Sequence, residues 1–157
     1  MCNIPTKVSD NEPIVRAICS PHHIKGNKLK ISAFKPPKNS VEVSVMRHTY
    51  FSANCCKSKG QSLSNSAMKP PKQYVGLAVV AALKVRDFGA DVKDSRHIFM
   101  GHADIVYPQP APDGEPLRSK VTWDLNRCLK GICDGAQYYP DPDPMSAAWG
   151  GPLLTAP

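Results

Sequence analysis

The stretch from Val41 to Phe51 constrains the fold most, because apolar and polar side chains alternate along it. A period of two is typical of a strand that buries one face. Val41, Val43 and Val45 mark the buried face, and Arg47 follows them on the same side. A guanidinium on an apolar face needs an anion. Arg47 is therefore predicted either to pair with a structural carboxylate or to bind a ligand phosphate.

The other elements follow from shorter apolar patterns. They predict strands at Ile14–Ile18, Lys28–Phe34 and His97–Val106, and helices at Lys72–Phe88 and Thr122–Asp134. Ser52–Lys72 is rich in Ser, Asn, Lys and Gly and is predicted to be a long polar loop. The order β-β-β-α-β-α indicates an α+β fold, with a small, mostly antiparallel sheet of about four strands and two helices. We expect one domain over residues 1–135 and a Pro/Gly-rich C-terminal tail over 136–157, which packs on the domain or on a partner.

One segment of the chain resembles another at an offset of 34 residues. Eight of fourteen positions are identical between Ser32–Val45 (SAFKPPKNSVEVSV) and Ser66–Val79 (SAMKPPKQYVGLAV). Two copies do not make a repeat protein, which needs three or more. The similarity is either a short duplication or a coincidence favoured by the shared Lys-Pro-Pro-Lys core.

The segment Ser95–Pro108 carries the densest candidate chemistry. In a regular strand His102 and Asp104 share a face, and an Asp beside an imidazole can orient it for acid–base work. Gly101 predicts a bulge that would bring His97 to the same face. These three residues are the candidate catalytic set, acting without a metal or as ligands of one. The alternative is that both histidines are ordinary half-buried residues with hydrogen-bond partners.

The charge of the chain favours a polyanionic partner. Its net charge is +7 with a pI of about 9.2, and the lysines crowd the first half. The candidate phosphate ligands are the basic residues near predicted loops and strand ends: Arg47, Lys57, Lys59, Lys35, Lys38, Lys69 and Lys72. A solubilising lysine surface is the alternative.

The cysteines and the hydropathy bear on the expected compartment. Six cysteines in irregular spacing and a polar start predict reduced thiols, no secretory signal and a cytoplasmic protein. No apolar run approaches the length of a membrane span, so no membrane partner is expected. Cys19 with His22 or His23 forms half of a zinc motif, but no clear second half follows. No motif indicates a particular cofactor.

These observations leave three functional classes open, of which the last is a structural subunit of a larger assembly whose long polar loop and proline-rich tail gain order from neighbouring proteins. The first is a basic module that binds nucleic acid, RNA included, or another phosphate-bearing ligand, as part of a larger assembly in which the tail docks on a protein partner. The second is a small hydrolase or nuclease that uses His102, Asp104 and His97 on nucleic acid or nucleotide. An enzyme predicts that these residues and Arg47 line one concave site, whereas a module predicts that they lie apart or are internally satisfied.

Overall fold

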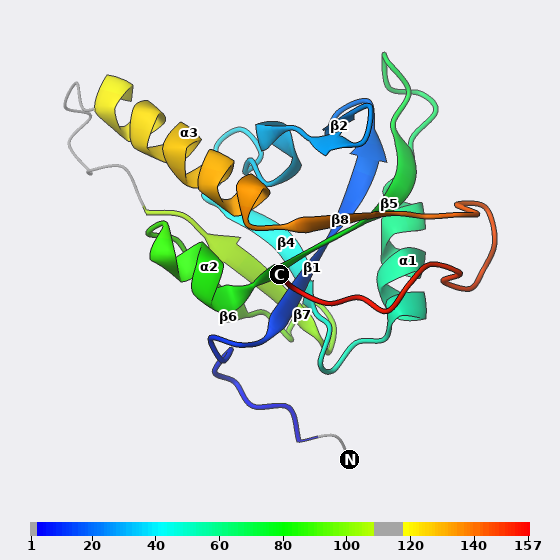
Figure 1. Ribbon diagram of the computed structural model, residues 1–157. Helices are drawn as coiled ribbons and strands as arrows, with labels where there is room; N and C mark the ends of the chain where they lie inside the picture. The colour runs from blue at the N-terminus through cyan, green and yellow to red at the C-terminus, as the bar shows by residue number, and fades with distance from the viewer. Residues whose placement is uncertain (1–2, 109–117) are drawn as a thin grey trace.

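The computed structural model describes residues 3–108 and 118–157 (Figure 1). The strands are β1 (Pro13–Ser20), β2 (Ile24–Lys25), β3 (Lys28–Leu29), β4 (Glu42–Arg47), β5 (Gln73–Ala81), β6 (Asp91–Asp94), β7 (His102–Val106) and β8 (Gln137–Pro140). The α-helices are α1 (Ala53–Ser62), α2 (Ala82–Asp87) and α3 (Arg118–Asp134), and a short 3-10 helix η1 covers Ile31–Ala33. The fold is α+β, as predicted.

Six of the strands form one antiparallel sheet in the order β6-β7-β4-β1-β5-β8. The expected sheet of about four strands is therefore too small, and three α-helices replace the expected two. Strand β1 lies in the interior of the sheet, where five of its eight residues are buried and the other three are half-buried, as suits a strand covered on both faces. It pairs with β5 along its whole length but with β4 over only two positions, Ile14–Arg47 and Val15–Met46.

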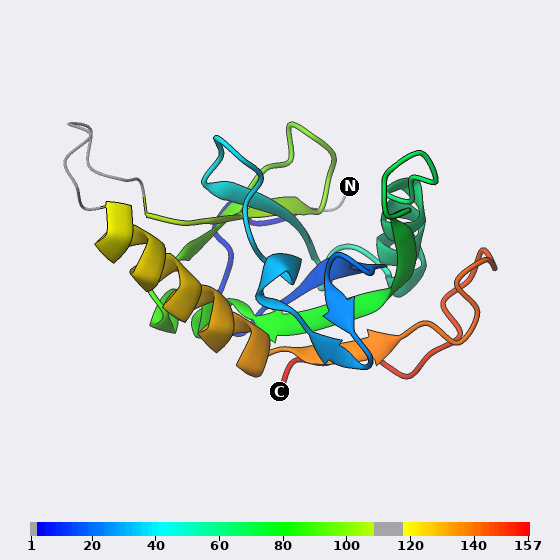
Figure 2. The same ribbon diagram turned by 90° about the horizontal axis from the view of Figure 1, so that it is seen from above.

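Each face of the sheet has its own hydrophobic core. The helices α2 and α3 cover one face, where Ile14, Val43 and Ile105 are buried with Leu129 of α3. Helix α1 covers the other face over Val15, Ala17 and Leu77, and the C-terminal segment adds Leu154. In Figure 2, α3 and α1 lie on opposite sides of the molecule. No helix within the described ranges is long and apolar enough to cross a membrane.

The helix predicted at Lys72–Phe88 is mostly a strand. Gln73–Ala81 forms β5, and only Ala82–Asp87 is helical. The apolar residues of β5 face both cores, with Leu77 on the α1 side and Ala78 on the α3 side. A strand buried on both faces has a continuous apolar run, and spacing within such a run does not separate strand from helix.

The loop predicted at Ser52–Lys72 contains α1. The Ser52 hydroxyl caps this helix by accepting a hydrogen bond from the Cys55 backbone N–H at 3.2 Å. The helix is polar overall and buries only Cys56, Lys57 and Gly60 on its inner face. Because the inner face is so narrow, the sequence of α1 lacks the apolar stripe that would have predicted a helix.

Two of the predicted strands are shorter than expected. Strand β7 begins at His102, and residues 95–101 form a loop that joins it to β6. Gly101 has φ of +92°, so it makes a turn at the start of β7 and not a bulge inside a longer strand. Lys28–Phe34 divides into the two-residue β3 and η1. Strand predictions at Ile14–Ile18 and Val41–Phe51 correspond to β1 and β4, and Thr122–Asp134 falls within α3.

The similar segments end in the two neighbours of β1. Val41–Val45 leads into β4 and Val75–Val79 lies in β5, and both strands pair antiparallel with β1. Their apolar side chains face opposite cores, since Val43 and Val45 belong to the α3 side whereas Leu77 and Val79 belong to the α1 side. The two segments thus lie on the two sides of β1 with opposite faces buried.

The C-terminal segment packs on its own chain. Strand β8 pairs with β5 at the edge of the sheet, and Leu154 is 3% exposed against the α1 core. Met145 and Leu153 are exposed. A protein partner that contacts this segment remains a prediction.

Candidate functional site

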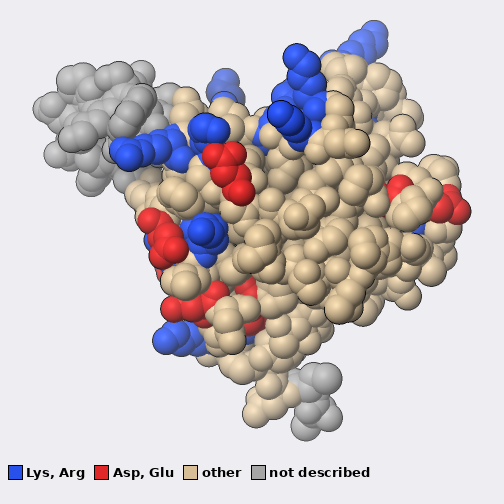
Figure 3. Space-filling model, viewed as in Figure 1, with Lys and Arg blue, Asp and Glu red and all other residues tan. Residues whose placement is uncertain are grey.

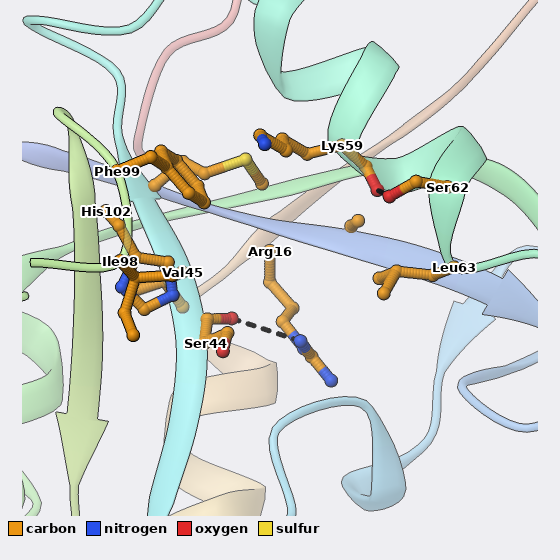
Figure 4. Close-up of a pocket in the computed structure, with 11 residues that line it drawn as sticks. Arg16, Ser44, Val45, Lys59, Ser62, Leu63, Ile98, Phe99 and His102 are labelled. Carbon is orange, nitrogen blue, oxygen red and sulfur yellow. Dashed lines mark hydrogen bonds between the residues drawn. The ribbon is translucent and has the colours of Figure 1, made fainter.

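Two adjoining hollows lie beside the loop that joins β6 to β7. The first lies between this loop and α1, and the second lies between this loop and the segment that leads into β4. The first has a volume of about 230 Å³ and the second about 600 Å³. Ser44, Ile98 and His102 line both of them. The first is shown in Figure 4, and its remaining lining residues are Arg16, Ala17, Val45, Met46, Lys59, Ser62, Leu63 and Phe99.

The first hollow forms where β1 and β4 separate. Beyond the Val15–Met46 pair the two strands are no longer paired, and Arg16 extends into the space. Its Nη1 donates a hydrogen bond to the Ser44 carbonyl oxygen at 3.0 Å, and its Nε donates to the Ala33 carbonyl oxygen at 3.0 Å. The side chain thus replaces backbone hydrogen bonds that a continuous sheet would make.

The charge of Arg16 has no carboxylate partner. Arg47, Arg86 and Arg96 all pair with aspartate or glutamate. Among the side chains that the structure describes, none of the ion pairs includes Arg16, whose two bonded nitrogens contact carbonyl oxygens only. Burial lowers the pKa of this guanidinium from its ordinary value. A partly buried, uncompensated guanidinium is an anion-binding group.

Lys59 supplies a second cation to the same hollow. It lies on the outward side of α1, and its Nζ is 4.2 Å from the centre of the Phe99 ring. Figure 4 shows Lys59 at one end of the hollow and the Arg16 guanidinium toward the other, with Leu63 and Ile98 between them on opposite sides. The hollow therefore combines apolar walls with two cations.

His102 is the buried polar group of the site. It is 5% exposed, and its Nδ1 has no hydrogen-bond partner. The Phe99 ring contacts it edge-on at 4.9 Å between ring centres. Burial lowers the pKa of His102, an effect that the nearby Asp104 carboxylate partly opposes. The imidazole is therefore neutral at pH 7, and its Nδ1 is a solvent-shielded nitrogen without a hydrogen-bond partner.

The predicted catalytic set lines the second hollow. His102 and Asp104 share a face of β7, opposite Met46 and Ser44 of β4, as the alternation predicted. His97 reaches the same hollow from the loop before β7. Asp104 accepts a hydrogen bond from the Ser95 hydroxyl at 2.5 Å and does not orient His102 Nδ1.

Two of the predicted phosphate ligands are enclosed by the protein itself. Arg47 is 0% exposed and pairs with Glu12 at 2.8 Å and Asp94 at 2.7 Å, which is the structural alternative that the sequence left open. The Lys57 ammonium is also fully buried, and it pairs with Asp141 at 3.0 Å. Neither residue lines the two hollows, so neither belongs to the proposed site.

The remaining predicted phosphate ligands divide between the hollow and other surfaces. Lys59 lines the first hollow, whereas Lys35 and Lys38 lie before β4 and Lys69 and Lys72 lie before β5. Lys35, Lys38 and Lys69 are exposed. On the face seen in Figure 3, Lys and Arg gather along the upper edge, over β2 and the loop ahead of β5, and acids lie near α2 and β6.

Among the described residues, no group of three or more His, Cys, Asp or Glu side chains is placed so that it could hold a metal ion. In the proposed half zinc site, His23 Nδ1 accepts a hydrogen bond from the Cys19 backbone N–H at 3.0 Å and is thereby occupied. The five cysteines in the described ranges are free thiols.

Sequence reasoning missed Arg16, the residue on which the site is centred. The available signal was one arginine within the apolar strand IVRAI. A charged side chain in a central strand requires a local reason. That reason is the separation of β1 from β4, which depends on the tertiary structure.

Comparisons with known proteins do not assign the chain to a family. No family model, curated protein or solved structure matches it. The function must therefore be argued from the geometry of the two hollows.

Proposed function

We propose that the protein binds a phosphate-bearing ligand, with nucleic acid as the leading class, in the first hollow. The observation that carries this proposal is Arg16, a partly buried guanidinium that lines a hollow without a carboxylate partner. Lys59 adds a second positive charge at the same hollow. The net charge of +7 supports the same class of ligand, because it favours encounter with polyanions.

A salt-titrated binding assay tests the proposal. Fluorescein-labelled RNA and DNA oligonucleotides, single-stranded and double-stranded, are titrated by anisotropy at about 50 mM and about 200 mM salt. Arg16→Met should weaken binding about tenfold or more, since a hydrogen bond to a charged group is lost. Lys28→Met is the matched control, because it removes an exposed charge from β3, outside the hollow.

Two results would contradict this function. Binding that is absent even at about 50 mM salt, or that ignores salt, excludes electrostatic phosphate recognition. Equal losses in Arg16→Met and Lys28→Met would show that only overall charge matters. Circular dichroism of each variant establishes that the fold is retained. Arg16→Lys keeps the positive charge but removes the planar guanidinium, so it separates the effect of the charge from that of the guanidinium geometry.

A second candidate function is hydrolysis of the bound phosphodiester. The observation in its favour is that His97, His102 and Asp104 line the second hollow, which adjoins the first through His102. A neutral imidazole is the form required of a general base. Incubation of labelled RNA and DNA, with and without EDTA, should give products that disappear in His102→Ala. Intact substrate with the native protein after prolonged incubation contradicts this candidate and leaves ligand binding in place.

A further inference from the structure

The first hollow separates its two cations with an apolar centre. Lys59 lies at one end, and the Arg16 guanidinium extends toward the other (Figure 4). Between them the walls are formed by Leu63 on the α1 side and by Ile98 and Phe99 on the loop side. A simple phosphate site would bring its cations together around one anion. This arrangement suits a ligand that has an apolar, flat body between two anionic groups.

We propose that the first hollow holds one unstacked nucleotide of a single-stranded nucleic acid, with its base in the apolar centre and its two flanking phosphates at Arg16 and Lys59. This inference rests on the proposed function and names its substrate class. A nucleotide inside a strand has a phosphate on each side of its sugar, whereas a free nucleoside monophosphate has one only. A single strand is also the form in which a base is free to leave its neighbours and enter a protein pocket.

The size of the hollow agrees with one base and excludes a duplex. Its volume of about 230 Å³ lies below the ~300 Å³ at which pockets for drug-sized molecules begin. In a duplex the bases are stacked and paired, so extrusion of one would cost a few kcal/mol. Duplex DNA would therefore present only phosphates to Arg16 and Lys59, without filling the apolar centre.

His102 is placed to recognise the edge of that base. It is 5% exposed and lines the hollow, and its Nδ1 is shielded from solvent and has no hydrogen-bond partner, so a turn of the ring would bring this nitrogen to a bound base. A buried nitrogen of this kind is costly unless a ligand or water completes it. The neutral ring presents one N–H donor and one acceptor, which are the groups that base edges require. His102 thus gives the hollow a means to prefer some bases over others.

The second hollow limits the path of the strand. Glu42 and Asp104 line it, and their carboxylates repel a phosphate backbone. Lys93 on the same hollow offsets only part of this charge. The strand should therefore leave the first hollow along α1, and the recognised unit should be a single nucleotide. This path leads away from His97 and Asp104, so the inference goes with ligand binding and not with the hydrolytic candidate.

The first experiment compares four ligands of equal length by competition anisotropy. They are a single-stranded oligonucleotide, its duplex, an abasic single strand and inorganic polyphosphate. The intact single strand should bind about 5- to 100-fold more tightly than the abasic strand, because one base is stacked and enclosed. Equal affinity for the intact and abasic strands, or tighter binding of the duplex, would overturn the inference while leaving phosphate binding intact. Failure of all four to bind would overturn the proposed function itself.

The second experiment tests the two phosphate positions with small ligands. A nucleoside 3′,5′-bisphosphate should bind about tenfold or more tightly than the 5′-monophosphate, because each charge-assisted contact adds to the affinity. Lys59→Met should abolish this difference, whereas Lys35→Met, which lies outside the hollow, should preserve it. Equal binding of the two ligands to the native protein would contradict the two-phosphate arrangement. His102→Ala should reduce discrimination among the four bases, and unchanged base preference would exclude His102 from recognition.

Discussion

The Nη1 atom of Arg16 lies 3.0 Å from the carbonyl oxygen of Ser44 and so occupies the point where β1 and β4 part. On its other edge β1 pairs with β5 from Pro13 to Ser20, with one register shift between Ile18 and Cys19. The sheet is therefore open on one side of its central strand only. The Arg16 side chain extends into that opening.

Lys57 and Lys59 lie two residues apart on α1, but only mutation of Lys57 should strongly reduce the stability of the protein. Lys57→Met removes the partner of the buried Asp141 and the hydrogen bonds to Asp143, Ser146 and Ala148, so it should lower the free energy of unfolding by about 3–5 kcal/mol. Lys59→Met should change that free energy by less than about 1 kcal/mol, because Lys59 is exposed. Urea denaturation measures both.

The same two variants should show the reverse pattern in ligand binding. Lys59→Met is expected to weaken oligonucleotide binding about tenfold, while Lys57→Met should leave it unchanged at temperatures where the variant is folded. A loss of affinity in Lys57→Met without loss of structure would contradict the purely structural role assigned to its ammonium.

The salt dependence of binding should report two phosphate contacts. For a single strand, the slope of log K against log salt is about −0.7 per phosphate neutralised, which gives about −1.4 for Arg16 and Lys59 together. Arg16→Met or Lys59→Met should each reduce this slope by about 0.7. Titrations at four or more salt concentrations measure it. A slope that remains the same in both variants would place the phosphates elsewhere.

His23 should make the protein less stable in mild acid. Burial, assisted by Arg16, lowers its pKa to about 3, against about 6.5 in the unfolded chain. Between these two values the unfolded state binds more protons, so the free energy of unfolding falls as pH falls, by up to about 1.4 kcal/mol per pH unit. Thermal and urea unfolding between pH 7 and pH 4 measure the slope.

His23→Asn is the matched control for this pH dependence. The Asn side chain keeps an acceptor near the Cys19 backbone N–H but does not titrate in this range. The variant should have a flatter stability profile below pH 6.5. Identical profiles for the two proteins would show that other groups cause the acid sensitivity.

Gly60→Ala should destabilise the protein although alanine favours helices. A Cβ at this position would lie 2.6 Å from Tyr74 Cδ1 and 3.1 Å from the Ala17 Cβ. The Tyr74 ring is 1% exposed and its hydroxyl donates to Asp141 at 2.8 Å, so the ring has little room to move. Overpacking should cost about 1–3 kcal/mol, more than the ~1 kcal/mol gained in helix propensity. Ser58→Ala, on the exposed side of α1, should stay within about 0.5 kcal/mol.

Local pattern was sufficient for some elements and insufficient for others. The alternation around Val43 predicted β4, and it also placed His102 and Asp104 on one face of β7. Helix α1 was missed because its inner face is narrow and includes Lys57, whose partner Asp141 lies 84 residues away in the sequence. The residues near Lys57 in the sequence do not indicate that it pairs with Asp141.

The site itself depends on tertiary structure more than the fold does. The sequence indicated His102 as a candidate and showed that Lys59 was basic, but it did not separate Lys59 from the enclosed Lys57. The importance of Arg16 follows from the end of β1–β4 pairing at Val15–Met46, which no pattern within either strand predicts.

The most direct test of the account is to locate the bound phosphate on the protein by NMR. Pyrophosphate, and then a nucleoside 3′,5′-bisphosphate, is added to ¹⁵N-labelled protein, and shifts of backbone amides and arginine Nε–Hε groups are followed. The account predicts the largest changes at Arg16 Nε and at the amides of Ser44, Lys59, Phe99 and His102. Shift changes confined to the exposed lysines before β4 and β5, without a change in the Arg16 Nε–Hε signal, would contradict the proposed site.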